Sequence, residues 1–124
     1  MNDKIEFAVP ENIAKIVVNG GSVTRDETRG VLLFPANCVI TKTDGILLSL
    51  PYGGTVSDDG TVTAQEEVTI TEPSGVETTI FIPTRKSVIV RPNGNVDKPF
   101  GSAVIVAIPG RQPKAYFMRP PITF

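Results

Sequence analysis

Residues 38–50, "CVITKTDGILLSL", decide the fold class, because they set two strand-like runs on either side of Asp44-Gly45. Branched side chains such as Val39 and Ile40 suit a pleated sheet better than a helix. Asp-Gly is a favoured two-residue hairpin turn, since both of its positions accept a positive φ. This stretch therefore predicts a β-hairpin.

The same pattern recurs along the chain. Short runs rich in Val, Thr and Ile flank turn signals in residues 55–65, "TVSDDGTVTAQ", and 67–82, "EVTITEPSGVETTIFI". Residues 91–95, "RPNGN", mark another turn. About eight to ten short antiparallel strands at this spacing are typical of a sandwich or a barrel. The sequence therefore predicts an all-β fold, a β-sandwich or barrel, with a jelly roll as one candidate arrangement.

Composition supports this fold class and bounds the number of domains. The 124 residues include 15 Val, 12 Ile and 13 Thr, against 5 Leu and 7 Ala. A chain of this length can bury a core as one domain without disulfides or metal. We therefore expect a single β domain over residues 1–124, with residues 1–4 and 119–124 as candidate extended arms.

Histidine is absent from the chain, and Cys38 is the only cysteine. Ser-His-Asp and Cys-His catalysis cannot be built without histidine. Zinc sites of the usual type cannot be built from one cysteine. Cys38 lies in an apolar run, which predicts a small buried side chain rather than a reactive thiol. We therefore expect no enzyme activity, no cofactor and no metal site.

Paired carboxylates are the remaining candidates for catalysis. Asp58 and Asp59 stand directly before Gly60, and Asp26-Glu27 forms a second pair. Glycosidase chemistry requires two carboxylates that face each other across a cleft, which neighbours at a hairpin tip do not. Residues 58–60 are therefore predicted to form a turn, and an enzyme that uses these four carboxylates stays an alternative.

Charge is distributed unevenly along the chain. Residues 1–84 carry 5 basic and 12 acidic groups, whereas residues 85–124 carry 7 basic groups and 1 acidic group, for a net charge of −1. This asymmetry either orients the protein against a partner or a second copy, or is scattered over solvated faces. The slightly negative total argues against a nucleic-acid partner. No apolar run is long enough to span a bilayer, so we expect no membrane partner.

The C-terminal stretch 110–124, "GRQPKAYFMRPPITF", combines cations, aromatic residues, Met and Pro. Interface cores favour aromatic residues, Met and Arg, and a segment stiffened by proline loses little entropy when it docks. The stretch is either a partner-binding arm or a final strand with a frayed end. The candidate interface residues are Arg111, Lys114, Tyr116, Phe117, Met118, Arg119 and Phe124.

The whole chain resembles the small all-β decoration (cement) proteins of tailed-phage capsids. The resemblance rests on small size, the lack of His and Trp, richness in Thr and Val, the turns "TDGI", "SDDGT" and "EPSG", and the tail "RPPITF". It implies a non-enzymatic protein that is made in the host cytoplasm and stabilises the capsid surface of the virion. The implied partner is the major capsid protein or another virion protein, and the implied assembly is a homo-oligomer, most often a trimer.

Two alternatives to this function remain. A phage tail or neck component fits nearly as well. A soluble carbohydrate-binding module would present exposed aromatic side chains, and Tyr52, beside Gly53-Gly54, is the candidate residue.

Overall fold

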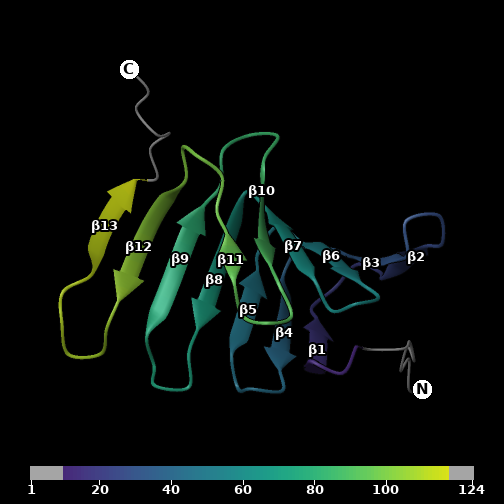
Figure 1. Ribbon diagram of the computed structural model, residues 1–124, viewed down its shortest axis with the longest axis horizontal. Coiled ribbons are helices and arrows are strands. Elements are labelled where there is room, and N and C mark those ends of the chain that lie inside the picture. The colour runs from purple at the N-terminus through teal and green to yellow at the C-terminus, as the bar shows by residue number, and fades with distance from the viewer. Residues whose placement is uncertain (1–9, 118–124) are drawn as a thin grey trace.

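The computed structural model describes residues 10–117, which form strands and no helix (Figure 1). The predicted all-β fold is therefore confirmed. The candidate arms at residues 1–4 and 119–124 lie outside the described residues. Thirteen strands lie in the described range: β1 (Ile13–Val18), β2 (Thr24–Asp26), β3 (Val31–Phe34), β4 (Cys38–Lys42), β5 (Leu47–Leu50), β6 (Gly54–Ser57), β7 (Val62–Gln65), β8 (Glu67–Thr71), β9 (Glu77–Phe81), β10 (Ser87–Val90), β11 (Val96–Asp97), β12 (Ala103–Ala107) and β13 (Lys114–Phe117).

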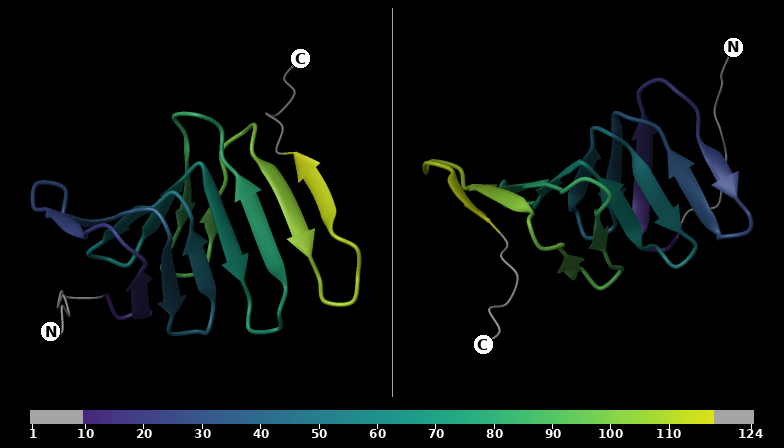
Figure 2. Two further views of the ribbon diagram at one scale, coloured as in Figure 1. Left: turned by 180° about the vertical axis from the view of Figure 1, so that it is seen from behind. Right: turned by 90° about the horizontal axis from the view of Figure 1, so that it is seen from above.

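The strands form a sandwich of two antiparallel sheets. The seven-stranded sheet has the order β1-β4-β5-β8-β9-β12-β13, and the six-stranded sheet has the order β11-β10-β7-β6-β3-β2. After β1, the chain adds one hairpin to each sheet in turn: β2–β3 enters the six-stranded sheet and β4–β5 returns to the seven-stranded one. The sandwich therefore grows in one direction, from β1 and β2 to β13 (Figures 1 and 2).

This topology corrects two details of the prediction. A jelly roll interleaves distant strands through Greek-key connections, whereas each sheet here adds its strands in chain order. The jelly-roll arrangement is therefore wrong. The strand number exceeds eight to ten because short strands such as β2 and β11 carry no alternating apolar pattern.

Four hairpins share one turn, and it differs from the predicted two-residue form. Between β4 and β5, the Gly45 amide donates to the Lys42 carbonyl (3.0 Å) and the Lys42 amide donates to the Ile46 carbonyl (2.8 Å). Three residues therefore connect the strands, and Gly45 takes the left-handed conformation (φ 92°) of a bulged hairpin. The hairpin is confirmed, but the two-residue turn is wrong. The same hydrogen bonds recur at residues 57–61, 72–76 and 91–95.

Residues with positive φ also occur where the chain crosses from one sheet to the other. The chain leaves one sheet for the other at Asn37 (φ 64°), Glu66 (φ 66°) and Arg85 (φ 68°), and at Gly53 (φ 84°). Side chains with a Cβ rarely adopt this region. At Glu66 the carbonyl accepts a hydrogen bond from the Ile82 amide (2.9 Å), which ties the crossing to the segment after β9.

The inward faces of both sheets form one core. Cys38 is fully buried within it, and burial raises the pKa of its thiol to about 11, so the expected buried cysteine is confirmed. Val104 of β12 is also fully buried, so the core reaches the strand next to β13. The other large side chains without solvent access are Ile40, Leu48, Leu50, Ile80, Val56, Val62, Val68 and Val88.

Candidate functional site

Strand β13 is an edge of the seven-stranded sheet, and β12 is its only pairing partner among the described strands. It is also the only one of these strands whose residues are all exposed. Seen from above, β12 and β13 extend past the six-stranded sheet (Figure 2). This end of the sandwich is therefore open to another molecule.

The alternation of hydrogen-bonded pairs determines which backbone groups of β13 face outward. The Glu72 amide donates to the Val76 carbonyl (2.9 Å) at the β8–β9 turn, and the registers continue from there to β13 without a bulge. Counting alternate pairs from this turn across β9 and β12 makes Val104–Tyr116 a hydrogen-bonded pair. This pairing directs the N–H and C=O groups of Ala115 to the free edge, where a strand from another chain can pair with them.

Phe117 lies on the outer face of the seven-stranded sheet and is 69% exposed. The register places Ala103 opposite Phe117 on one side and opposite Phe81 on the other, so the three outward side chains form a row across β9, β12 and β13. Phe81 is 42% exposed. We name this row, Phe81, Ala103 and Phe117, the aromatic corner. Two exposed aromatic side chains in one row are a feature of interaction surfaces.

Sequence reasoning found Phe117 but missed the other two residues of the corner. Phe81 did carry a signal, because it stands between Ile80 and Ile82, which are both buried, and must therefore point outward. Ala103 carried none, since its place depends on pairing with strands that lie more than ten residues away on either side.

The rest of the outer face of the seven-stranded sheet is poor in charge. Antiparallel sheets with a solvated face usually show polar residues there. One in-register row crosses all seven strands and contains Val17, Val39, Ser49, Thr69, Thr79, Ile105 and Ala115. The charged side chains that these strands direct to this face are Lys15, Glu67 and Glu77. Such a face can be covered by a partner without stripping water from many charges.

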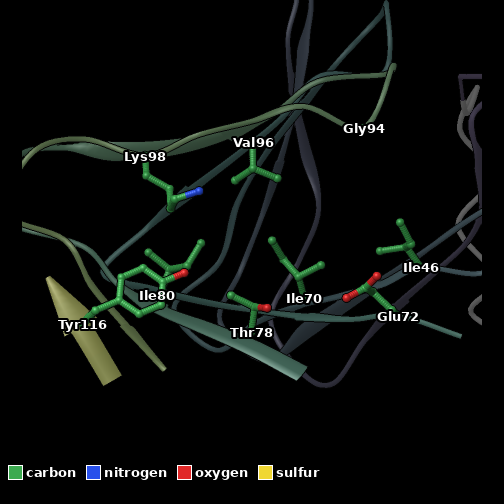
Figure 3. A pocket seen from close by; sticks show the side chains of 9 residues that line it. All are labelled: Ile46, Ile70, Glu72, Thr78, Ile80, Gly94, Val96, Lys98 and Tyr116. Atoms are coloured by element: carbon green, nitrogen blue, oxygen red, sulfur yellow. The ribbon is translucent and has the colours of Figure 1, made fainter. Parts of the chain in front are cut away.

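Tyr116 points to the opposite, inner face, since side chains alternate along a strand. It borders a hollow of about 300 Å³ where the two sheets separate (Figure 3). Lys98 and Tyr116 approach this hollow from opposite sides, and Ile80 lies beside the ring (Figure 3). The remaining lining residues are Ile46, Ile70, Glu72, Thr78, Gly94 and Val96.

The structure therefore divides the predicted interface residues between two faces. Phe117 belongs to the outer face, whereas Lys114 and Tyr116 belong to the inner one. Arg111 lies in the β12–β13 turn, where its amide donates to the Ile108 carbonyl (3.0 Å). The other three predicted residues, Met118, Arg119 and Phe124, lie outside the described residues.

Asp58 and Asp59 lie in the β6–β7 turn, as predicted. Hydrogen bonds from the Ser57 hydroxyl and from the Thr61 amide (3.0 Å) hold the pKa of Asp59 below its usual value. Asp58 accepts two hydrogen bonds from the Arg25 guanidinium (3.0 Å each), and this pairing lowers the pKa of Asp58. Both carboxylates are therefore held ionised.

Three of the four carboxylates that were candidates for catalysis pair with an arginine, whereas Asp59 bonds only Ser57 and Thr61. Arg25 also pairs with Glu27 (2.8 Å), and Arg29 approaches Asp26 (3.9 Å). Ionised carboxylates beside arginine are poor proton donors near neutral pH. The network has the character of a solvated surface rather than of a site for acid–base chemistry.

Neither a metal site nor a membrane span is found in the described part of the chain. No group of three or more Cys, Asp or Glu side chains in residues 10–117 could hold a metal ion. No helix in that range is long and apolar enough to cross a bilayer. Comparison with protein-family models, with curated proteins and with solved structures finds no match to this chain.

Proposed function

We propose that the protein is a non-enzymatic structural protein that binds a repeating protein surface, as a decoration protein on a viral capsid does. The observation that carries this proposal is the charge-poor outer face of the seven-stranded sheet, which ends in the aromatic corner. The expected partner is the major capsid protein or another virion protein, and the expected location is the capsid surface.

The aromatic corner supplies the anchors of this interface. Exposed Phe81 and Phe117 can enter apolar pockets of a partner, and buried aromatic anchors provide most of the binding energy in protein interfaces. Glu67 lies opposite Phe81 on the next strand, so a charged residue borders the corner. An apolar centre with a polar rim is the usual composition of a specific interface.

The open edge of β13 serves association between copies. Its outward backbone groups at Ala115 can pair with a strand of a neighbouring copy, which leaves the outer face of the sheet free for the particle. Arg111 and Lys114 make the β13 end basic. Near β2, four carboxylates outnumber the two arginines, Arg25 and Arg29, so that end is net negative. Opposite charges at two ends favour head-to-tail contacts, which can close into a ring such as the expected trimer.

Sedimentation with the particle tests the proposal. Native protein from the source lysate should migrate with a heavy particle in a sucrose gradient. The double variant Phe81→Ala/Phe117→Ala should remain folded by circular dichroism but lose at least about tenfold in particle affinity, since both anchors are removed. Tyr52→Ala is the matched control, because it removes an exposed aromatic side chain (57%) outside the aromatic corner and should not change binding.

Two outcomes would overturn the proposal. The native protein could be recovered only in the light fractions, or the double variant could bind the particle as tightly as the wild type. Gold-labelled antibody then separates the decoration protein from the tail or neck component. Labels over the whole head support decoration, whereas labels confined to the tail or to one vertex support the alternative.

A further inference from the structure

The outer face of the six-stranded sheet carries a second surface of different character. A hollow of about 330 Å³ lies there beside Tyr52. Tyr52 is 57% exposed, so one aromatic ring stands open at its border. Polar groups supply most of the remaining lining, which consists of Arg29, Leu33, Phe34, Gly54, Thr55, Thr63, Gln65 and Ser87.

The polar side chains of the hollow stand on neighbouring strands and face the same way. Thr55 of β6 lies opposite Thr63 of β7, and Gln65 of β7 lies opposite Ser87 of β10. Residues two apart on a strand share a face, so Thr63 and Gln65 join the two pairs into one patch. Three adjacent strands therefore present a continuous group of hydroxyls and an amide.

The backbone of Tyr52 belongs to a tight turn between β5 and β6. The Gly53 amide donates to the Leu50 carbonyl (3.1 Å), and a Cβ at Gly53 would lie 2.4 Å from the Phe34 carbonyl oxygen. A Cβ at Gly54 would lie 2.3 Å from the Thr63 carbonyl oxygen. Only glycines allow this close approach, and the resulting turn sets the backbone from which the Tyr52 side chain reaches the border of the hollow.

The hydrogen-bonding groups of the patch are available to a ligand. Within residues 10–117, the side chains of Thr55, Thr63, Gln65 and Ser87 form no hydrogen bond with another protein group. A sugar offers hydroxyls that donate and accept hydrogen bonds, and an apolar C–H face that packs on an aromatic ring. Free polar groups beside one exposed aromatic ring therefore match the chemistry of a sugar better than that of an apolar ligand.

We propose that this hollow binds a saccharide. The ring of Tyr52 stacks on the C–H face of a sugar, and Thr55, Thr63, Gln65 and Ser87 bond its hydroxyls. Arg29 adds a cation to the lining, and its ion pair with Asp26 is long (3.9 Å), so an acidic sugar is favoured over a neutral one. The two outer faces of a sandwich point in opposite directions, so a saccharide here and a particle on the seven-stranded sheet can be bound together. The proposal does not depend on the particle-binding function.

Tyrosine fluorescence gives a direct test, because Tyr52 and Tyr116 are the two tyrosines and Trp is absent. In a Tyr116→Phe background, the signal reports Tyr52 alone. This protein is titrated to millimolar concentration with neutral oligosaccharides of glucose, galactose, mannose and N-acetylglucosamine, and with oligogalacturonate. We expect a saturable change with at least one of them, and strongest binding with the acidic one. Amide chemical-shift changes should map to the strands β6, β7 and β10.

Two variants separate this site from adventitious binding. Thr63→Val preserves shape but removes a hydroxyl, and should weaken binding by about tenfold, as for a lost hydrogen bond. Tyr52→Ala, followed by chemical shifts, should abolish binding while the fold is retained. The proposal is overturned if no saccharide in the panel changes the spectrum, or if Tyr52→Ala binds as the wild type does. Neither result bears on sedimentation with the particle.

Discussion

Glu66 occupies the single position between β7 and β8, where the chain passes from the six-stranded to the seven-stranded sheet. Its φ of 66° is left-handed, which a residue with a Cβ adopts at a cost of about 1 kcal/mol. Its neighbour Glu67 is an ordinary strand residue. The sequence "EE" gives no sign of this difference, since glutamate has no preference for positive φ.

Two adjacent substitutions should therefore have opposite effects on stability. Glu66→Gly removes the strain of the left-handed residue and should raise the free energy of unfolding by about 0.5 kcal/mol, after the added freedom of the unfolded chain is counted. Glu67→Gly places glycine in a strand and should lower it by about 1 kcal/mol. Urea denaturation of both variants measures the difference. A loss of equal size in both would show that Glu66 is not strained.

The ion pair of Arg25 with Asp58 should be visible in a pH titration. Arg25 lowers the pKa of Asp58, so the pair contributes stability above the pKa of the unfolded carboxyl, and this contribution is lost as pH falls through the folded value. Arg25→Ala should raise the pKa of Asp58 toward its usual value, as followed by carboxyl NMR. Asp59 is the internal control, because its pKa is lowered by Ser57 and Thr61. An unchanged Asp58 would contradict the pairing.

At the scale of the element, the open edge of β13 can be closed by one substitution. The N–H of Ala115 faces outward, so Ala115→Pro removes an edge donor without breaking the bonds to β12. We expect unchanged stability within about 1 kcal/mol and loss of association between copies, measured by analytical ultracentrifugation. Tyr116→Pro is the matched control, since it removes a bond to β12 and should destabilise the fold by more than about 1 kcal/mol. Association that persists in Ala115→Pro would exclude the edge as the contact.

Hairpins were predictable from the sequence because glycine marks each of their turns. The turn length was not, because the bulged hairpin and the two-residue hairpin both accept Asp-Gly. They differ in whether Thr43 or Lys42 pairs with Ile46, and here it is Lys42. Of the two aromatic residues in the candidate site, only one was predicted from the sequence. Phe117 could be named from the sequence as a candidate interface residue. Its position in one row with Phe81 could not, because that row depends on how β12 pairs with both β13 and β9.

At the scale of the whole molecule, the chain order of the strands makes stability depend on position. β8 has a neighbour on each side, whereas β13 pairs with β12 alone among the described strands. Because β13 pairs on one side only and all its residues are exposed, we expect it to open without the rest. The hydrogen-bonded amide of Tyr116 should exchange at least about tenfold faster than that of Val68 in NMR hydrogen exchange. Equal protection would mean that the sandwich opens only as a unit.

The addition of one hairpin after another also has a consequence for synthesis. Each strand from β3 to β13 pairs with a strand made earlier, and the longest such span, from Glu77 to Ala107, is 30 residues. A nascent chain can therefore complete each part of the sandwich soon after it leaves the ribosome, without waiting for its C-terminus. Unpaired strands are then few at any moment of translation, and β13, the last of the described strands to emerge, leaves an edge that another molecule can meet.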